Sequence, residues 1–207
     1  MRRGAGVNRR ELTRLALAAA LAQALAAHTP YAQWTIYRRR NLFVVASRTD
    51  EEAVRLARAV AEGLAAELAD SRARFTRASD SVRIASLLKS GQLDVAVIGR
   101  GDAGPMLAGA GPYTAVGTVP LRLVAKLGEH LLVTVEAFKD RHAFLLAAAL
   151  DRLEPSLALV EPATGRAQAV PYHPGALAYR RGEPIPSASS DPGSEPHARP
   201  HTHQHPQ

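Results

Sequence analysis

The sequence predicts an α/β domain with a mostly parallel sheet flanked by helices and with late antiparallel strands. Short apolar runs alternate with segments whose apolar residues recur at helical spacing, an order typical of parallel sheets covered by helices. We expect one such domain over residues 33–185, since about 100 to 200 residues form one domain. The chain has no cysteine, so neither a disulfide nor a metal–thiolate site is expected.

The first half of this domain follows the order strand, helix, strand, helix, strand. Three runs predict the strands, namely 41–47, 73–78 and 94–99. The first helix begins after an N-cap at Asp50, and the second begins after an N-cap at either Ser79 or Asp80. Gly91 follows the second helix, as is common beyond a helix C-terminus. This order predicts crossover connections and a parallel sheet.

The second half begins with an interruption. Residues 100–118 are rich in glycine and include two prolines, which predicts a loop with one short helix. Residues 121–126 and 130–135 then form two strands joined as a hairpin around Gly128, and a helix follows over 140–153. His173 is expected to fix a turn, because Pro-Gly follows it directly.

Residues 1–32 have the order of parts of an export signal. The adjacent Arg9 and Arg10 resemble a twin-arginine signal and precede the uncharged run 15–27, which is 13 residues long and too short to cross a bilayer. The alternative is an amphipathic helix that packs on the domain. We therefore expect a periplasmic or otherwise exported protein, cleaved after Ala27 or Ala32 or tethered by an uncleaved signal.

Residues 186–207 are rich in proline, serine and histidine and predict a disordered tail. Imidazole groups bind divalent metals, so the tail histidines are candidate ligands: His197, His201, His203 and His205. The alternative is a solvated tail with adventitious metal affinity, since no preformed site holds these side chains.

The composition argues against two classes of function. The formal net charge is +7, but residues 1–14 alone hold five arginines against one glutamate, so the rest of the chain is only mildly basic and no nucleic-acid interface is predicted. Nucleophile-elbow, zinc-protease, phosphate-loop and dinucleotide signatures are all absent from the sequence. We therefore predict a protein that is not an enzyme and that has no cofactor.

Three segments carry a resemblance to a known family. Residues 79–98, "SDSVRIASLLKSGQLDVAVI", resemble the "G-S-x-E-N-L-x-x-L-x-x-G-x-x-D-x-A-x-V" segment of periplasmic solute-binding proteins, and residues 119–153 resemble their late paired strands and helix. Residues 170–183, "VPYHPGALAYRRGE", are similar to the C-terminal "P-L-H-P-G-A-x-x-Y-Y-x-E" of the TAXI group, which serves TRAP-type transporters.

This resemblance implies one lobe of a type II periplasmic-binding-protein-like fold. A complete receptor of the group has a second lobe after the third strand, where this chain has only 100–118, and its ligand loop after the first strand is replaced here by 47–53. The resemblance implies an exported solute-binding or transport-accessory protein that binds a small anionic, carboxylate-like solute. Its implied partners are TRAP-type membrane subunits, and self-association could supply the missing wall.

Candidate ligand-binding residues lie where the parallel strands end. Ligands of open α/β sheets bind at the carboxyl ends of the strands, which predicts a site from these residues: Ser47, Arg48, Ser79, Asp80, Ser81 and Arg100. Serine hydroxyls and free N–H groups at a helix start can receive an anion, and an arginine can hold a carboxylate with two hydrogen bonds. The alternatives are an ordinary capped helix and solvated arginines.

A second class of function stays open from the sequence. A single lobe without solute binding could serve as a protein-interaction module of a membrane-associated complex. Convergence of Ser79, Ser81 and Arg48 on a concave pocket favours solute binding, and their dispersal over a flat surface favours the interaction module.

Overall fold

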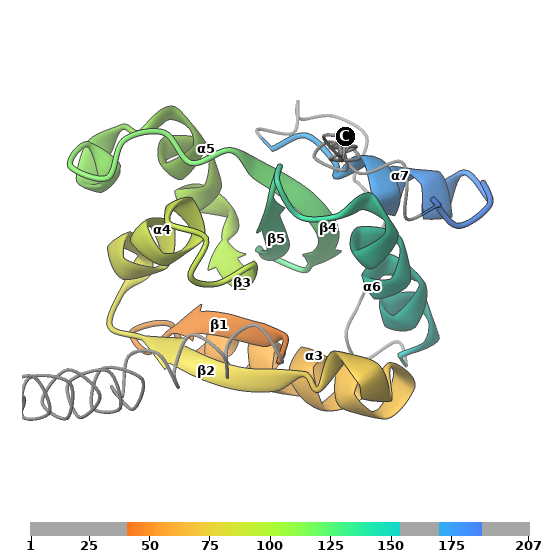
Figure 1. Cartoon of the computed structure of the whole chain (residues 1–207). Helices are drawn as coiled ribbons and strands as arrows, with labels where there is room; N and C mark the ends of the chain where they lie inside the picture. Colours follow the sequence, from red (N-terminus) through yellow and green to blue (C-terminus); the bar gives the residue numbers. More distant parts are fainter. Residues whose placement is uncertain (1–40, 154–169, 188–207) are drawn as a thin grey trace, which may run out of the picture. The chain divides into compact units, whose positions relative to one another are not determined.

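The computed structural model describes residues 41–153 and 170–187 (Figure 1). The chain divides into two units, residues 1–41 and 42–207, and every element discussed here belongs to the second. The predicted signal at 1–32 and the four tail histidines lie outside the described residues. Within the described ranges, no helix has both the length and the apolar character needed to cross a membrane.

A five-stranded mixed sheet forms the middle layer, in the order β2-β1-β3-β5-β4. The strands are β1 (Phe43–Ser47), β2 (Arg74–Ala78), β3 (Val95–Gly99), β4 (Leu121–Leu127) and β5 (His130–Val135). β1 pairs in parallel with β2 and β3, and β5 pairs antiparallel with β3 and β4. The predicted α/β class, the parallel first half and the late antiparallel strands are confirmed. The sheet as a whole is mixed rather than mostly parallel, because β5 pairs antiparallel on both of its sides.

Helices cover both faces of this sheet (Figure 1). One face carries α3 (Glu51–Glu67), α6 (Asp140–Arg152) and α7 (Pro174–Arg180), and the other carries α4 (Ser81–Lys89) and α5 (Arg100–Ala108). Side chains alternate along a strand, so Val44 and Ala46 of β1 join one apolar cluster while Val45 joins the other. Because both faces of β1 are buried, its sequence is a continuous run of apolar residues.

Residues 100–118 are more regular than the predicted loop. α5 spans nine residues and contains Pro105, and a 3-10 turn follows over Gly111–Tyr113. The helix ends at Gly109, whose φ of 64° is left-handed, and an added Cβ there would lie 2.6 Å from the Gly117 carbonyl carbon. Burial of Ala103 and Met106 against the sheet offsets the poor helix propensity of this segment.

Residues 170–180 return to the sheet beside β4. The backbone N–H of Leu123 donates to Pro171 and the N–H of His173 donates to Leu123, both at 2.8 Å. The buried His173 side chain then caps α7 by accepting from the Gly175 N–H at 3.2 Å. A turn was expected at His173, and the structure shows that His173 is the N-cap of the short helix α7. This helix packs against α6.

Candidate functional site

The candidate site lies where the chain leaves β1 and β3. These parallel strands are neighbours, but β1 leads into α3 on one face of the sheet and β3 leads into α5 on the other. Such a divergence opens a crevice at the carboxyl edge, where ligands of open α/β sheets bind. α4, which follows β2, begins at the same edge.

A small pocket of about 50 Å³ occupies this crevice. Its apolar lining comes from Val97 and Ile98 of β3, Ala53 of α3 and Ile84 of α4. The polar side chains around it are three hydroxyls and two carboxylates: Ser47, Thr49, Ser81, Asp50 and Asp102. Pockets that enclose a drug-sized ligand measure about 300 to 1,000 Å³, so this one has room for a single functional group.

Asp50 joins one wall of the pocket to the β4–β5 hairpin. Its Oδ1 accepts from the Ala53 N–H at 2.9 Å, and its Oδ2 lies 2.9 Å from Nε2 of His130. Burial opposes ionisation of this carboxyl, but the hydrogen bonds from Ala53 and His130 outweigh burial and lower the pKa of Asp50. Asp50 is therefore an anion at neutral pH with both oxygens engaged.

Tyr113 joins the opposite wall, formed by α4 and α5. Its side chain is fully buried, and its hydroxyl lies 2.7 Å from Oδ1 of Asp102 and 2.9 Å from Oγ of Ser81. Burial, with the nearby Asp102 carboxylate, raises the pKa of Tyr113 to about 12, although the Ser81 hydrogen bond works in the opposite direction. Tyr113 therefore holds Ser81 and Asp102 side by side at the pocket.

Two of the predicted site residues line the pocket. Ser47 is 6% exposed, and its Oγ lies 2.7 Å from the Thr49 hydroxyl and accepts from the Thr49 N–H at 3.2 Å. Ser81 is half-buried and reaches the pocket from the first turn of α4. Their hydroxyls come from the ends of two different segments, as the strand-end argument predicts.

Asp80 and Ser79 lie at the exposed start of α4. The Asp80 carboxylate caps the helix by accepting from the Arg83 N–H at 2.7 Å, and the Ser79 hydroxyl donates to it at 2.8 Å. These two bonds lower the pKa of Asp80, and the positive charge of Arg48 adds to the effect. Between the two N-caps left open from the sequence, the structure selects Asp80.

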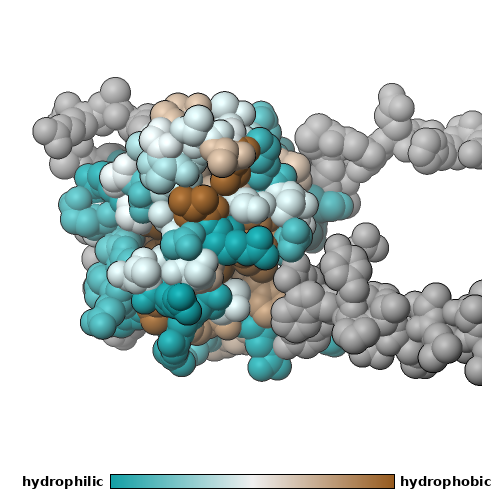
Figure 2. Space-filling model, turned by 90° about the vertical axis from the view of Figure 1, so that its left-hand side faces the viewer, coloured by the Kyte–Doolittle hydropathy of each residue, from teal (hydrophilic) through white to brown (hydrophobic). Residues whose placement is uncertain are grey.

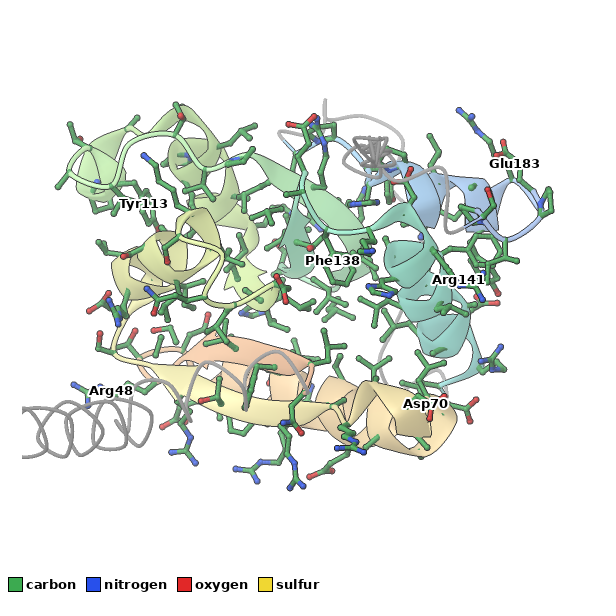
Figure 3. The ribbon with its side chains drawn as sticks, viewed as in Figure 1. Arg48, Asp70, Tyr113, Phe138, Arg141 and Glu183 are labelled. Carbon is green, nitrogen blue, oxygen red and sulfur yellow. The ribbon has the colours of Figure 1, made fainter. Side chains whose placement is uncertain are left out.

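The two predicted arginines lie outside the pocket. Arg48 is exposed and extends outward from the domain (Figure 3). Arg100 turns onto the β4–β5 hairpin, where its guanidinium donates to the Gly128 carbonyl at 2.8 Å and lies 4.0 Å from the Glu129 carboxylate. Neither arginine lines the pocket.

The surface around this edge is mostly hydrophilic. Figure 2 shows the side of the domain on which α4 and α5 lie, with hydrophilic residues over most of it and a small hydrophobic patch near the centre. Across residues 41–153 and 170–187, no group of three or more histidine or acidic side chains is arranged to hold a metal ion.

A larger hollow of about 540 Å³ lies away from this edge, between β4, α6 and α7. Its apolar lining residues Val124 and Leu150 are each only 1% exposed, so they offer almost no surface to a ligand. The Tyr179 hydroxyl donates to Asp151 there at 2.8 Å. Convergent polar groups rather than volume favour the β1–β3 crevice as the candidate site.

Sequence reasoning missed five polar residues of the site: Thr49, Asp50, Asp102, Tyr113 and His130. It predicted Asp50 only as the N-cap of a helix. Asp102 had a usable signal, because it follows the third predicted strand within three residues, as Arg100 does. His130 and Tyr113 had no such signal in the sequence. The position of His130 depends on the pairing of β5 with β3, and that of Tyr113 depends on the 3-10 turn after α5.

No protein-family model matches this chain, and the search of curated proteins likewise gives no match.

Proposed function

We propose that this protein is an exported, non-enzymatic solute-binding or transport-accessory protein of the TAXI type. The observation that carries the proposal is the convergence of Ser47 and Ser81 on one pocket at the divergence of β1 and β3. The motif resemblance of residues 79–98 and 170–183 supports the same assignment. TRAP-type membrane subunits are the transport partners in this proposal.

The solute is held by one end. A pocket of about 50 Å³ accepts one small polar group, and the remainder of the solute lies over the edge of the sheet. An anionic, carboxylate-like end is placed at the rim near Arg48 and the start of α4, because Asp50 and Asp102 repel a carboxylate inside the pocket. A second copy of the chain supplies the wall that a single lobe lacks.

Thermal unfolding of the full chain against small carboxylates, amino acids and phosphorylated compounds tests this proposal. A ligand that binds only the folded state stabilises it by about 2.7 kcal/mol at a hundredfold excess over the dissociation constant. We expect a rise in melting temperature that disappears in the Ser81→Ala, Arg48→Ala double variant. Arg83→Ala is the matched control, since Arg83 is exposed on α4 and does not line the pocket.

The small volume of the pocket and the exposure of Arg48 and Ser79 favour a second candidate function. In it, the lobe is a protein-interaction module of a membrane-associated complex without solute binding. The absence of any ligand-induced thermal shift across the panel would favour this candidate.

Divalent-metal binding by the histidine tail stays a prediction from the sequence alone. Deleting residues 197–207 should remove metal uptake and leave the unfolding transition of the domain unchanged.

A further inference from the structure

The hydrogen-bonding capacity of the pocket is unevenly divided between donors and acceptors. A phenol has one proton, and a carboxylate at neutral pH can only accept, so the Tyr113 hydroxyl donates to Asp102. The short distance between Tyr113 and Ser81 then requires Ser81 to donate to the phenol oxygen. Ser81 is left with lone pairs only for a group in the pocket.

The other wall is similarly poor in donors. One hydroxyl proton is used between Ser47 and Thr49, which lie 2.7 Å apart, so the pair has one proton left for a ligand. The His130 ring N–H is used by Asp50, because a carboxylate cannot donate to it. Asp102 lines the pocket with a carboxylate that can only accept, and its Oδ2 lies 3.8 Å from the position that a Cβ on Gly99, another lining residue, would take.

The fixed charges in the lining have the same sign. Asp50 and Asp102 are the charged residues that line the pocket, and the positive charges of Arg48 and Arg100 lie outside it. Among the side chains that line this space, an anionic group would face two carboxylates and find one hydroxyl proton, whereas a cationic donor would meet several unused lone pairs.

We infer that the pocket between β1 and β3 binds a primary ammonium group of the solute, and that the solute's carboxylate stays outside at the rim. This inference rests on the proposed solute-binding function and names the chemical class of its ligand, an amino-substituted carboxylate. An ammonium group is close to water in size, and a water molecule takes about 30 Å³ of liquid volume, so it fits a space of about 50 Å³.

Norvaline and three analogues that each lack one of its polar groups test the inference in the full-length protein. The probes are norvaline, 2-hydroxypentanoate, pentanoate and butylamine, each titrated calorimetrically and by melting temperature. Norvaline should bind at least tenfold more tightly than pentanoate, with 2-hydroxypentanoate between them. Equal affinities for norvaline and pentanoate would overturn the inference while leaving the proposed function intact, and binding of none of the four would count against both.

Asp102→Asn separates the charge from the shape of the site. The amide oxygen can still accept from Tyr113, and the amide NH₂ then replaces Oδ2, which puts a neutral donor in place of a charged acceptor. We expect at least a tenfold loss of norvaline and butylamine affinity, with pentanoate affinity unchanged or raised. Asp70→Asn is the matched control, because Asp70 is an exposed aspartate at the opposite end of the domain from Arg48 (Figure 3).

Unchanged norvaline affinity in Asp102→Asn would overturn the inference. The unliganded melting temperature of the variant shows whether it folds. If it does not fold, the comparison of norvaline with pentanoate in the unmodified protein still decides the question.

Discussion

The imidazole Nε2 of His130 lies 2.9 Å from the carboxylate Oδ2 of Asp50, eighty residues earlier in the chain. The contact joins the first residue of β5 to the N-cap of α3, and so connects the late hairpin to the first crossover of the sheet. It also closes one side of the candidate pocket, which Asp50 lines.

Asp50→Ala should destabilise the domain through two losses. Removing an N-cap costs about 0.5 to 2 kcal/mol, and contacting residues are coupled by about 0.5 to 3 kcal/mol. Urea unfolding of Asp50→Ala, His130→Ala and the double variant measures the coupling. Strictly additive effects would show that the Asp50–His130 contact contributes nothing, and Asp70→Ala should change stability by less than about 0.5 kcal/mol.

Tyr113→Phe should lower the free energy of unfolding by about 1 to 3 kcal/mol, because it removes two hydrogen bonds of a fully buried hydroxyl, one of them to a carboxylate. The affected groups are Ser81 and Asp102. Chemical denaturation measures the loss, and Tyr179→Phe is a comparison at a more exposed tyrosine, whose hydroxyl binds Asp151. A loss no larger in Tyr113→Phe than in Tyr179→Phe would contradict the role assigned to Tyr113.

Alkaline titration should show that Tyr113 loses its proton at a higher pH than an exposed tyrosine does. Burial raises the pKa of Tyr113 to about 12 from an ordinary value of 10.0, so the folded protein keeps a proton that the unfolded chain loses. Stability should therefore fall as pH rises from about 10 towards 12. The difference in phenolate absorbance between the unmodified protein and Tyr113→Phe should appear near pH 12, and a difference near pH 10 would contradict the assignment.

Acidification should destabilise the domain through His173. Its Nε2 donates to the carbonyl of Phe138 (Figure 3) at 2.8 Å, and its Nδ1 accepts from the Gly175 N–H. Burial of the imidazole lowers the pKa of His173 below the ordinary value of 6.5. The unfolded chain binds a proton that the folded state excludes, so the free energy of unfolding should decrease as pH falls below about 6.5.

His173→Asn provides the comparison for this pH effect. Asparagine can still cap α7 but has no imidazole to titrate. The difference in unfolding free energy between the unmodified protein and this variant should shrink as pH falls below about 6.5, and a difference independent of pH would contradict the neutral, buried His173.

Two glycine substitutions should act in opposite directions. In Gly175→Ala the new Cβ would lie 1.9 Å from the backbone oxygen of Asp140, so the α6–α7 contact must shift, at a cost of about 1 to 3 kcal/mol or more.

In Gly101→Ala the new Cβ, which lies inside α5, meets nothing within 4 Å. The higher helix propensity of alanine should therefore stabilise the folded domain by about 0.5 to 1 kcal/mol. Melting temperatures of the two variants measure both effects, and a tolerated Gly175→Ala would show that the two helices separate easily.

The predicted elements that match the structure most closely depend on local signals. Asp50 caps α3 and Gly91 follows α4 with a φ of 64°, as the N-cap and C-terminal glycine patterns indicate. The hairpin turn at Gly128 also has a left-handed φ, of 62°. By contrast, α5 was predicted only in part, because its glycines and Pro105 argue for a loop and its helix depends on burial against the sheet.

The sequence by itself determined the α/β class, the order of the five strands with α3, α4 and α6, and the presence of serine and arginine at the strand ends, because capping, periodicity and turn chemistry act over a few residues. Only the tertiary structure decided which of those side chains meet. Parallel pairing of β1 with β3 brings Ser47 to the crevice beside Ser81, while the hairpin carbonyl at Gly128 takes the Arg100 guanidinium away from it. His130 and Tyr113 reach the site through contacts across 80 and 32 residues, which no local pattern specifies.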